Sequence, residues 1–111
     1  MDIKSMQDIN AKFSESRGWF YHKASNTDDM ISKLGYNAVA ISGEVGEFAN
    51  LVKKVLRNKE RLNDEMLAHM KEKVADVFIY TLIVSQLLNM DLESEFLKKQ
   101  GKNEGRFEKK N

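Results

Sequence analysis

The stretch from Leu34 to Leu56 reads LGYNAVAISGEVGEFANLVKKVL and decides the fold, because its apolar residues recur in steps of three and four. That spacing is typical of one face of a long α-helix that packs against other helices. A second line on the same helix places two glutamates between a small residue and a leucine. The apolar line comprises Ile31, Leu34, Ala38, Ile41, Val45, Phe48, Val52 and Val55, and the second line comprises Ala40, Glu44, Glu47 and Leu51.

Glu44 and Glu47 do not follow the usual pattern of a solvated, ion-paired helix face. The residue four positions after each is apolar rather than basic, and two like charges three residues apart repel by a few tenths of a kcal/mol. Gly43 and Gly46 each disfavour the helix by about 1 kcal/mol relative to alanine. A metal ion shared by the glutamates, and the close approach of another helix or a ligand at the glycines, would account for this pattern. The alternative is an ordinary acidic surface.

Composition indicates a single all-α domain over residues 1–111. The chain has no proline and no cysteine, so disulfides, thiolate zinc sites and cysteine nucleophiles are excluded. Its formal net charge is +1, which disfavours a general nucleic-acid-binding role. The N-terminus lacks the apolar core of a signal peptide, and no uninterrupted apolar run reaches about 18 residues, the minimum for a membrane span. We therefore expect a cytoplasmic protein without a membrane partner.

The order of patterns along the chain predicts about four helices. The first runs from Ile3 to Arg17 and stops at Gly18, and a second starts at Thr27 as N-cap and ends near Arg57. After a polar connection over 58–63, a third helix starts near Asp64 and is almost wholly apolar from Val74 to Leu88. A short fourth helix follows from 91 to about 100, and then a basic tail. We expect an antiparallel helical bundle.

An aromatic cluster, Trp19 to His22, lies in the first predicted connection. It either covers the open end of the bundle or forms a stacking surface for a base or sugar. His22 is expected to be a hydrogen-bonding bystander, and His69 an exposed helix residue.

Asp76 is the only charged residue between Val74 and Leu88. A buried carboxylate needs a cation or strong donors, because leaving it unpaired costs several kcal/mol. If a neighbouring helix brings Glu44 and Glu47 to Asp76, a hard divalent ion, Mg²⁺ or Mn²⁺, is the simplest counterion. The alternative is a structural aspartate bonded to a lysine or to Tyr80.

Three segments together resemble the MazG-like all-α nucleotide pyrophosphohydrolases, which include dCTP pyrophosphatases and all-α dUTPases. The resemblance implies a helical bundle of oligomerising subunits with a Mg²⁺ site made by an ExxE and an ExxD pair. It also implies cleavage of nucleoside triphosphates between the α and β phosphates, giving the monophosphate and pyrophosphate. The segments are 40–47 (AISGEVGE), 74–80 (VADVFIY) and 102–107 (KNEGRF).

Several residues acquire roles from this resemblance. Glu44 and Glu47 match the ExxE pair and Asp76 matches the aspartate of ExxD, as metal ligands and catalytic residues. The glutamate expected three residues before Asp76 is replaced by Lys73, and Glu72 is a substitute ligand on the other side. The expected substrate contacts are Lys73, Tyr80, Lys99, Asn103, Lys54 and Trp19.

The sequence thus predicts a Mg²⁺-dependent pyrophosphohydrolase acting on a (d)NTP of undetermined base. A catalytically weak binding protein with the same fold is the alternative, because Lys73 replaces a ligand. Lys73 is expected to limit the site to one metal ion. The apolar second and third helices predict a homodimer or homotetramer.

Overall fold

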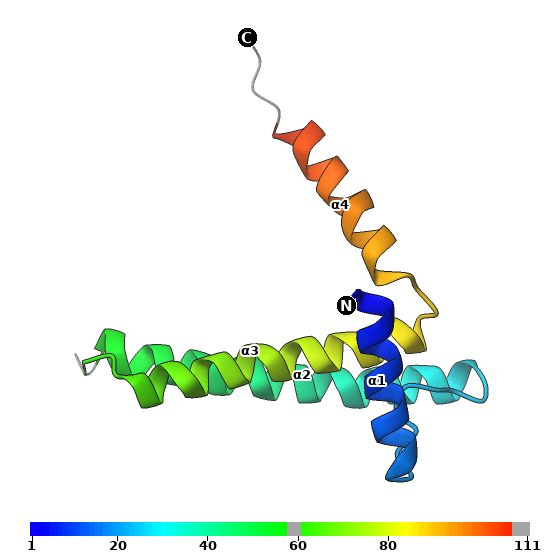
Figure 1. The fold of residues 1–111 in the computed structure, drawn as a ribbon, viewed down its shortest axis with the longest axis horizontal. Helices are drawn as coiled ribbons and strands as arrows, with labels where there is room; N and C mark the ends of the chain where they lie inside the picture. Colours follow the sequence, from blue (N-terminus) through cyan, green and yellow to red (C-terminus); the bar gives the residue numbers. More distant parts are fainter. Residues whose placement is uncertain (58–60, 108–111) are drawn as a thin grey trace.

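A computed structural model describes residues 1–57 and 61–107, and all of its regular structure is helical (Figure 1). The predicted all-α class is confirmed. Residues 58–60 of the predicted connection and 108–111 of the tail lie outside the described residues. The helices are α1 (Ile3–Ser16), α2 (Thr27–Arg57), α3 (Asp64–Leu87) and α4 (Leu92–Arg106).

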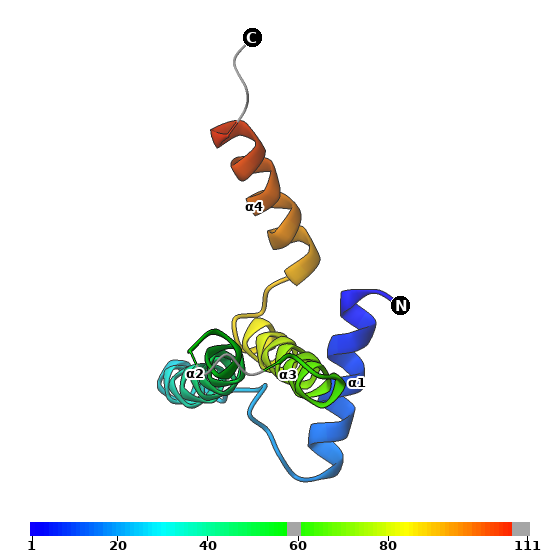
Figure 2. The same cartoon turned by 90° about the vertical axis from the view of Figure 1, so that its left-hand side faces the viewer.

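An antiparallel pair of long helices, α2 and α3, forms the body of the chain. The two helices lie side by side along most of their length, whereas α1 crosses α3 near its C-terminal end, on the side away from α2 (Figures 1 and 2). Helix α4 turns away from the pair, bent by 102° relative to α3. One chain by itself therefore forms a helical pair crossed by a third helix, and not the complete four-helix bundle that we expected.

Side-chain caps fix where the helices start. Asp2 accepts a hydrogen bond from the Ser5 amide at 2.8 Å at the start of α1. The amide of Asp29 donates to Asn26 Oδ1 at 2.8 Å, so the cap of α2 is Asn26 and not Thr27 as predicted. An asparagine amide oxygen caps as well as a hydroxyl, and here it reaches the third amide of the helix. Gly18 has φ +76° and ends α1 as predicted.

Helix α4 is longer than predicted, since it continues to Arg106 instead of ending near Gln100. Its cap is Asp91, which accepts from the Ser94 amide at 3.2 Å. Gly101 and Gly105 lie inside the helix, where each disfavours helical structure by only about 1 kcal/mol. Much of the predicted basic tail is therefore helical.

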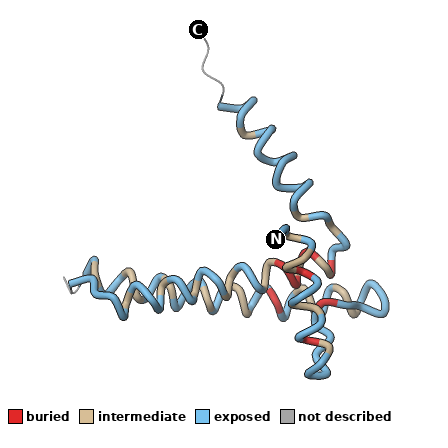
Figure 3. Tube along the Cα trace, viewed as in Figure 1, coloured by how far each residue is buried: buried red, intermediate tan, exposed pale blue. Residues whose placement is uncertain are grey.

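The single chain is not compact. Its radius of gyration is 17.4 Å, whereas a compact domain of this length has about 13 Å. Its accessible surface is 8612 Å², about 2,300 Å² more than a compact monomer of this mass exposes. Buried residues gather where α1 crosses α3 (Figure 3). Within the described residues the buried apolar side chains are Leu82, Ile83 and Leu87.

The prediction that Val74 to Leu88 is buried on most sides is wrong for one chain. Only its C-terminal part lies under α1, while Val74 remains 58% exposed and Phe78 40% exposed. On α2, Ile31 and Val45 of the apolar line are also exposed, at 60% and 48%. The reason is that α2 and α1 cover only two sides of α3.

No single helix among the described residues meets the length and hydropathy needed to cross a membrane, and only the bent pair of α3 and α4 passes when the two are taken together.

Candidate functional site

Four charged side chains meet between the middle of α2 and α3. The ammonium of Lys73 lies 2.6 Å from Glu47 Oε2, 3.2 Å from Glu44 Oε2 and 3.8 Å from Asp76 Oδ2. We call these four residues the carboxylate site. The three acids that the sequence assigned to one site are thus brought together, and the lysine that replaces the expected glutamate lies among them.

The carboxylate site is partly open to solvent. Glu44 and Lys73 are 22% and 25% exposed, whereas Asp76 is 41% and Glu47 59% exposed. The expectation of a buried Asp76 is wrong within one chain, because no third helix covers this part of α3. The close contacts with the carboxylates of Glu47 and Glu44 raise the pKa of Lys73 above its usual value, so the side chain is firmly an ammonium.

Glu44 has capacity for a further partner. Its Oε2 atom is buried, and its contact of 3.2 Å with the Lys73 ammonium is an ion pair without hydrogen-bond geometry. A buried carboxylate oxygen without an aligned donor is costly, and a better-placed cation would satisfy it. Three carboxylates also form the hard oxygen set that Mg²⁺ and Mn²⁺ prefer. The residues therefore fit one divalent ion, provided that the flexible Lys73 side chain moves from its position among them.

Within residues 1–57 and 61–107, no cluster of three or more acidic or histidine side chains has the arrangement of a ready metal site. Glu72 is exposed and makes no ion pair in that part of the chain. Its neighbour Lys73 holds the position beside the acids that a fourth ligand would take.

A pocket of about 420 Å³ lies next to the carboxylate site, between α1, the connection after it, α2 and α3. Its volume falls in the range of about 300–1,000 Å³ that is usual for small-molecule sites. Aromatic rings form much of the wall. The lining residues are Asn10, Phe13, Ser14, Trp19, Tyr21, His22, Tyr36, Asn37, Ile79, Tyr80 and Ile83.

Tyr80 connects the pocket to the carboxylate site. It lines the pocket, and its pKa is raised first by burial and then by the nearby Tyr36 and the carboxylates of Glu44 and Asp76. The phenol is therefore within electrostatic range of these carboxylates. A ligand in the pocket would lie beside the carboxylate site at this residue.

The aromatic cluster in the first connection forms one side of the pocket. Tyr21 stacks on Tyr36 of α2, with ring centroids 4.7 Å apart and planes 10° from parallel. Trp19 is 48% exposed and packs edge-on against Phe13 at 5.9 Å. These contacts favour the stacking surface over a simple cover, because the rings surround an open space.

A hydrogen-bonded histidine holds this connection against α1. His22 is 4% exposed, and its Nε2 lies 3.1 Å from Glu15 Oε1. Lys23 approaches the same oxygen at 2.6 Å, and the hydrogen bonds from Lys23 and His22 lower the pKa of Glu15. His22 thus has a structural partner, as predicted. His69 is exposed, also as predicted.

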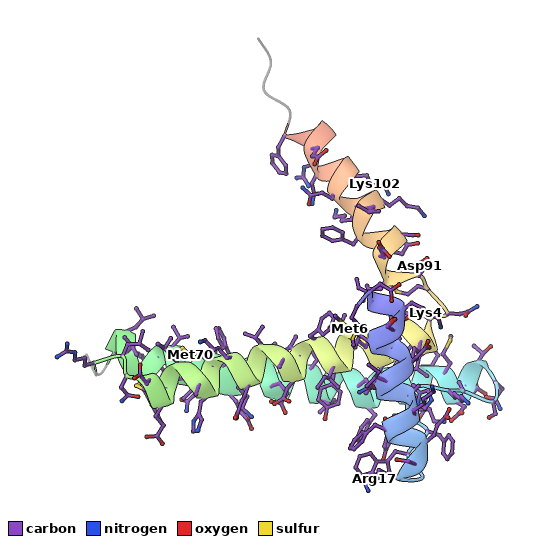
Figure 4. The ribbon with its side chains drawn as sticks, in the orientation of Figure 1. Lys4, Met6, Arg17, Met70, Asp91 and Lys102 are labelled. Carbon is purple, nitrogen blue, oxygen red and sulfur yellow. The ribbon has the colours of Figure 1, made fainter. Side chains whose placement is uncertain are left out.

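The predicted substrate contacts on α4 do not reach the site within one chain. Lys99 and Asn103 lie on α4, which extends away from the pair of α2 and α3 and buries none of its residues (Figure 1). Figure 4 shows Lys102 of the same helix far from Met70 on α3. Lys54 is exposed near the end of α2, more than one helical turn beyond Glu47.

The two glycines beside the acids face open space. A Cβ atom on Gly43 or Gly46 would meet no atom within 4 Å. The close approach predicted at these positions is therefore not made by residues 1–57 and 61–107 of the same chain.

Sequence reasoning missed Tyr36, Asn37 and Asn10 as pocket residues. The signal available was an asparagine inside the predicted second helix, next to a tyrosine. Neither residue indicates a site from the sequence alone, because the pocket exists only where α1 crosses α3 beside that end of α2.

Comparison with known proteins finds a similarity to a phage protein. A 62-residue stretch of the chain is 39% identical to the Gene 37 protein of Mycobacterium phage L5. This stretch is 55% of the chain and 52% of the phage protein, so the chain spans about half the length of this relative. No protein-family model matches the chain, and no solved structure matches it.

Proposed function

We propose that the protein is a Mg²⁺-dependent nucleoside triphosphate pyrophosphohydrolase of the MazG-like type, releasing a nucleoside monophosphate and pyrophosphate. The observation that carries the proposal is the meeting of Glu44, Glu47 and Asp76 on two helices beside an aromatic pocket. The acids suit a metal-bound phosphate chain, and the pocket suits a base. The two lie next to each other, as they do in a nucleotide.

The residues of the chain have distinct tasks in this proposal. Glu44, Glu47 and Asp76 would hold the ion, and Glu47, the more exposed of the two glutamates, would accept a proton from the attacking water. Bound Mg²⁺ would neutralise the phosphate oxygens and orient them. Lys73 is free to turn from the acids to a phosphate oxygen, where its ammonium supplies a fixed positive charge. Tyr80 and Trp19 position the sugar and base.

We further propose that the active form is a homodimer or homotetramer that associates through α2 and α3. The excess surface of about 2,300 Å² on each chain is larger than the roughly 800 Å² that one partner buries in a stable interface of standard size, so it could supply a large interface or more than one. Exposed apolar residues on both helices and the open space at Gly43 and Gly46 supply the contact face. In such an assembly Lys99 and Asn103 can approach the carboxylate site of another subunit.

One observation favours a second candidate, a nucleotide-binding protein of the same fold without turnover. Lys73 already neutralises part of the acidic charge, at 2.6 Å from Glu47 and 3.2 Å from Glu44. A permanent ion pair of this kind would compete with the metal.

Incubation with the common ribo- and deoxyribonucleoside triphosphates in the presence of Mg²⁺ separates the two candidates. The first predicts monophosphate and pyrophosphate from at least one triphosphate. Binding of nucleotides without any product supports the second.

Replacing Lys73 by glutamate should tighten Mg²⁺ binding at least about tenfold, because the change removes a repelling charge and adds a hard anionic oxygen. Calorimetric titration of wild type and Lys73→Glu measures this. Glu72→Ala is the matched control and should bind Mg²⁺ as wild type does, since Glu72 is exposed. Unchanged affinity in Lys73→Glu would contradict a metal site at these acids.

A further inference from the structure

An apolar groove of about 410 Å³ lies between α1 and α3. Ile9 and Phe13 on its α1 side and Phe78 on its α3 side are still between 40% and 54% exposed in the single chain. Val74 lies one helical turn before Phe78 on the same side of α3, so the groove continues into the open face of α3. A partner that covers this apolar surface would stabilise the protein. The groove is lined mainly by Met6, Ile9, Phe13, Phe78, Ile79 and Leu82.

Helix α4 carries apolar side chains that the described part of the chain leaves open. None of its residues is buried, and Phe96 and Phe107 are 59% and 72% exposed (Figure 3). The two rings lie on one side of α4, about three turns apart, and Leu92 lies on the same side one turn before Phe96. Leu97 is 61% exposed but lies about 100° round the helix from Phe96. We call Leu92, Phe96 and Phe107 the α4 stripe.

Hydrogen bonds in the turn before α4 keep the stripe from the groove of its own chain. Asn89 has φ +50°, and the Met90 amide donates to the Ser85 carbonyl oxygen at 3.0 Å, which ends α3. Asp91 then accepts a hydrogen bond from the Ser94 amide at 3.2 Å and starts α4. The two helices are bent by 102°, and α4 extends away from the pair of α2 and α3 (Figure 1). Laying α4 along its own groove would require this turn to be rebuilt.

A second copy of the chain supplies what each copy lacks. In a two-fold dimer the contact is made twice, because the α4 stripe of each copy meets the groove of the other. Both apolar surfaces are then covered on both chains. The surface needed for such a contact is present, since each chain exposes about 2,300 Å² more than a compact monomer and one partner in a standard interface buries roughly 800 Å².

We propose that the groove between α1 and α3 is the docking site for α4 of a second copy of this chain. The inference rests on the self-association proposed above, and it adds α4 to the contact surface of α2 and α3. It also concerns the aromatic pocket, because Asn10, Phe13 and Ile79 line both the groove and the pocket. The docked helix therefore packs behind a wall that the groove shares with the pocket.

Cross-linking between single-cysteine variants tests the contact, since the chain has no cysteine of its own. Ile9→Cys places a thiol in the groove, and Phe96→Cys, on a chain that carries a mass tag, places one in the stripe. Because each chain has one thiol, a short bismaleimide can join these two variants only between two molecules. We expect the joined product from full-length variants mixed at micromolar concentration.

Ser94→Cys replaces Phe96→Cys in the matched control. Ser94 is exposed and lies on the opposite side of α4, so it should give several-fold less of the joined product. Equal yields from the two variants, or no joined product, would overturn the proposal. So would a chain with cysteines at positions 9 and 96 that cross-links within itself at nanomolar concentration, because its α4 would then lie on its own groove.

Sedimentation provides a second measurement. Phe96→Lys should raise the dissociation constant of the assembly at least about tenfold, because an ammonium group would have to enter an apolar groove. Leu97→Lys adds the same charge at a neighbouring, equally exposed position outside the stripe and should leave the constant within about twofold of wild type. The same constant for both variants would contradict the docking of Phe96.

Failure of this inference and failure of the proposed function have different signatures. A wild-type oligomer that Phe96→Lys does not weaken would remove the docking of α4 and leave the association through α2 and α3 intact. A wild-type monomer would remove both. Neither measurement involves a nucleotide, so the proposed cleavage of triphosphates stands or falls by its own assay.

Discussion

Replacing Glu47 by glutamine is expected to lower pyrophosphate release by at least about 100-fold, the usual scale for loss of a general base or a metal-binding carboxylate. Glutamine has the same shape but neither accepts a proton nor offers an anionic oxygen. Glu47 is 59% exposed, so the change alters the charge at the site without disturbing a core. The measurement is steady-state release of pyrophosphate under saturating Mg²⁺, with circular dichroism as a check on folding.

Glu72→Gln is the control for this experiment. It removes the same charge one residue from Lys73, on an exposed position of α3, and should leave turnover within about twofold of wild type. Wild-type activity in Glu47→Gln would exclude this residue from the reaction.

A second large effect is expected on assembly. Val39 on α2 and Val74 on α3 are 74% and 58% exposed in the single chain. Lysine at both positions should turn an oligomer into a monomer at micromolar concentration, because burying two ammonium groups in an apolar interface costs several kcal/mol. Sedimentation velocity measures the change. Both side chains are more than half exposed, so the fold of the single chain should not be affected.

Leu97→Lys is the matched control for assembly. Leu97 is 61% exposed on α4, outside the α2 and α3 face, and its replacement should leave the oligomer intact. A wild-type protein that sediments as a monomer would contradict the proposed assembly. The chain would then keep its apolar surface open to water, which is rare for soluble proteins.

Local signals made the helices predictable. Gly18 and the apolar spacing set helix ends and faces through interactions within a few residues, and the structure has α2 at the predicted bounds. The meeting of Glu44, Glu47 and Asp76 was also predictable, because carboxylates at helical spacing on two adjacent apolar helices have few other partners.

The pocket was not predictable in the same way. It depends on α1 crossing α3, which brings Asn10 and Asn37 into the wall of one pocket through contacts between residues far apart in the chain. The sequence around a single asparagine in a helix does not indicate that the residue lines a pocket. The burial of Val74 to Leu88 was overestimated for a related reason. Apolar residues on most sides of a helix indicate that several neighbours can cover it, but within one chain only its C-terminal part is covered.

The central claim is tested most directly by phosphorus NMR of CTP and ATP incubated with the wild-type protein and Mg²⁺, beside the Glu47→Gln variant. The account predicts signals of the monophosphate and pyrophosphate with wild type, and neither signal above background with the variant. Release of diphosphate and inorganic phosphate, or the same products from wild type and variant at the same rate, would contradict it.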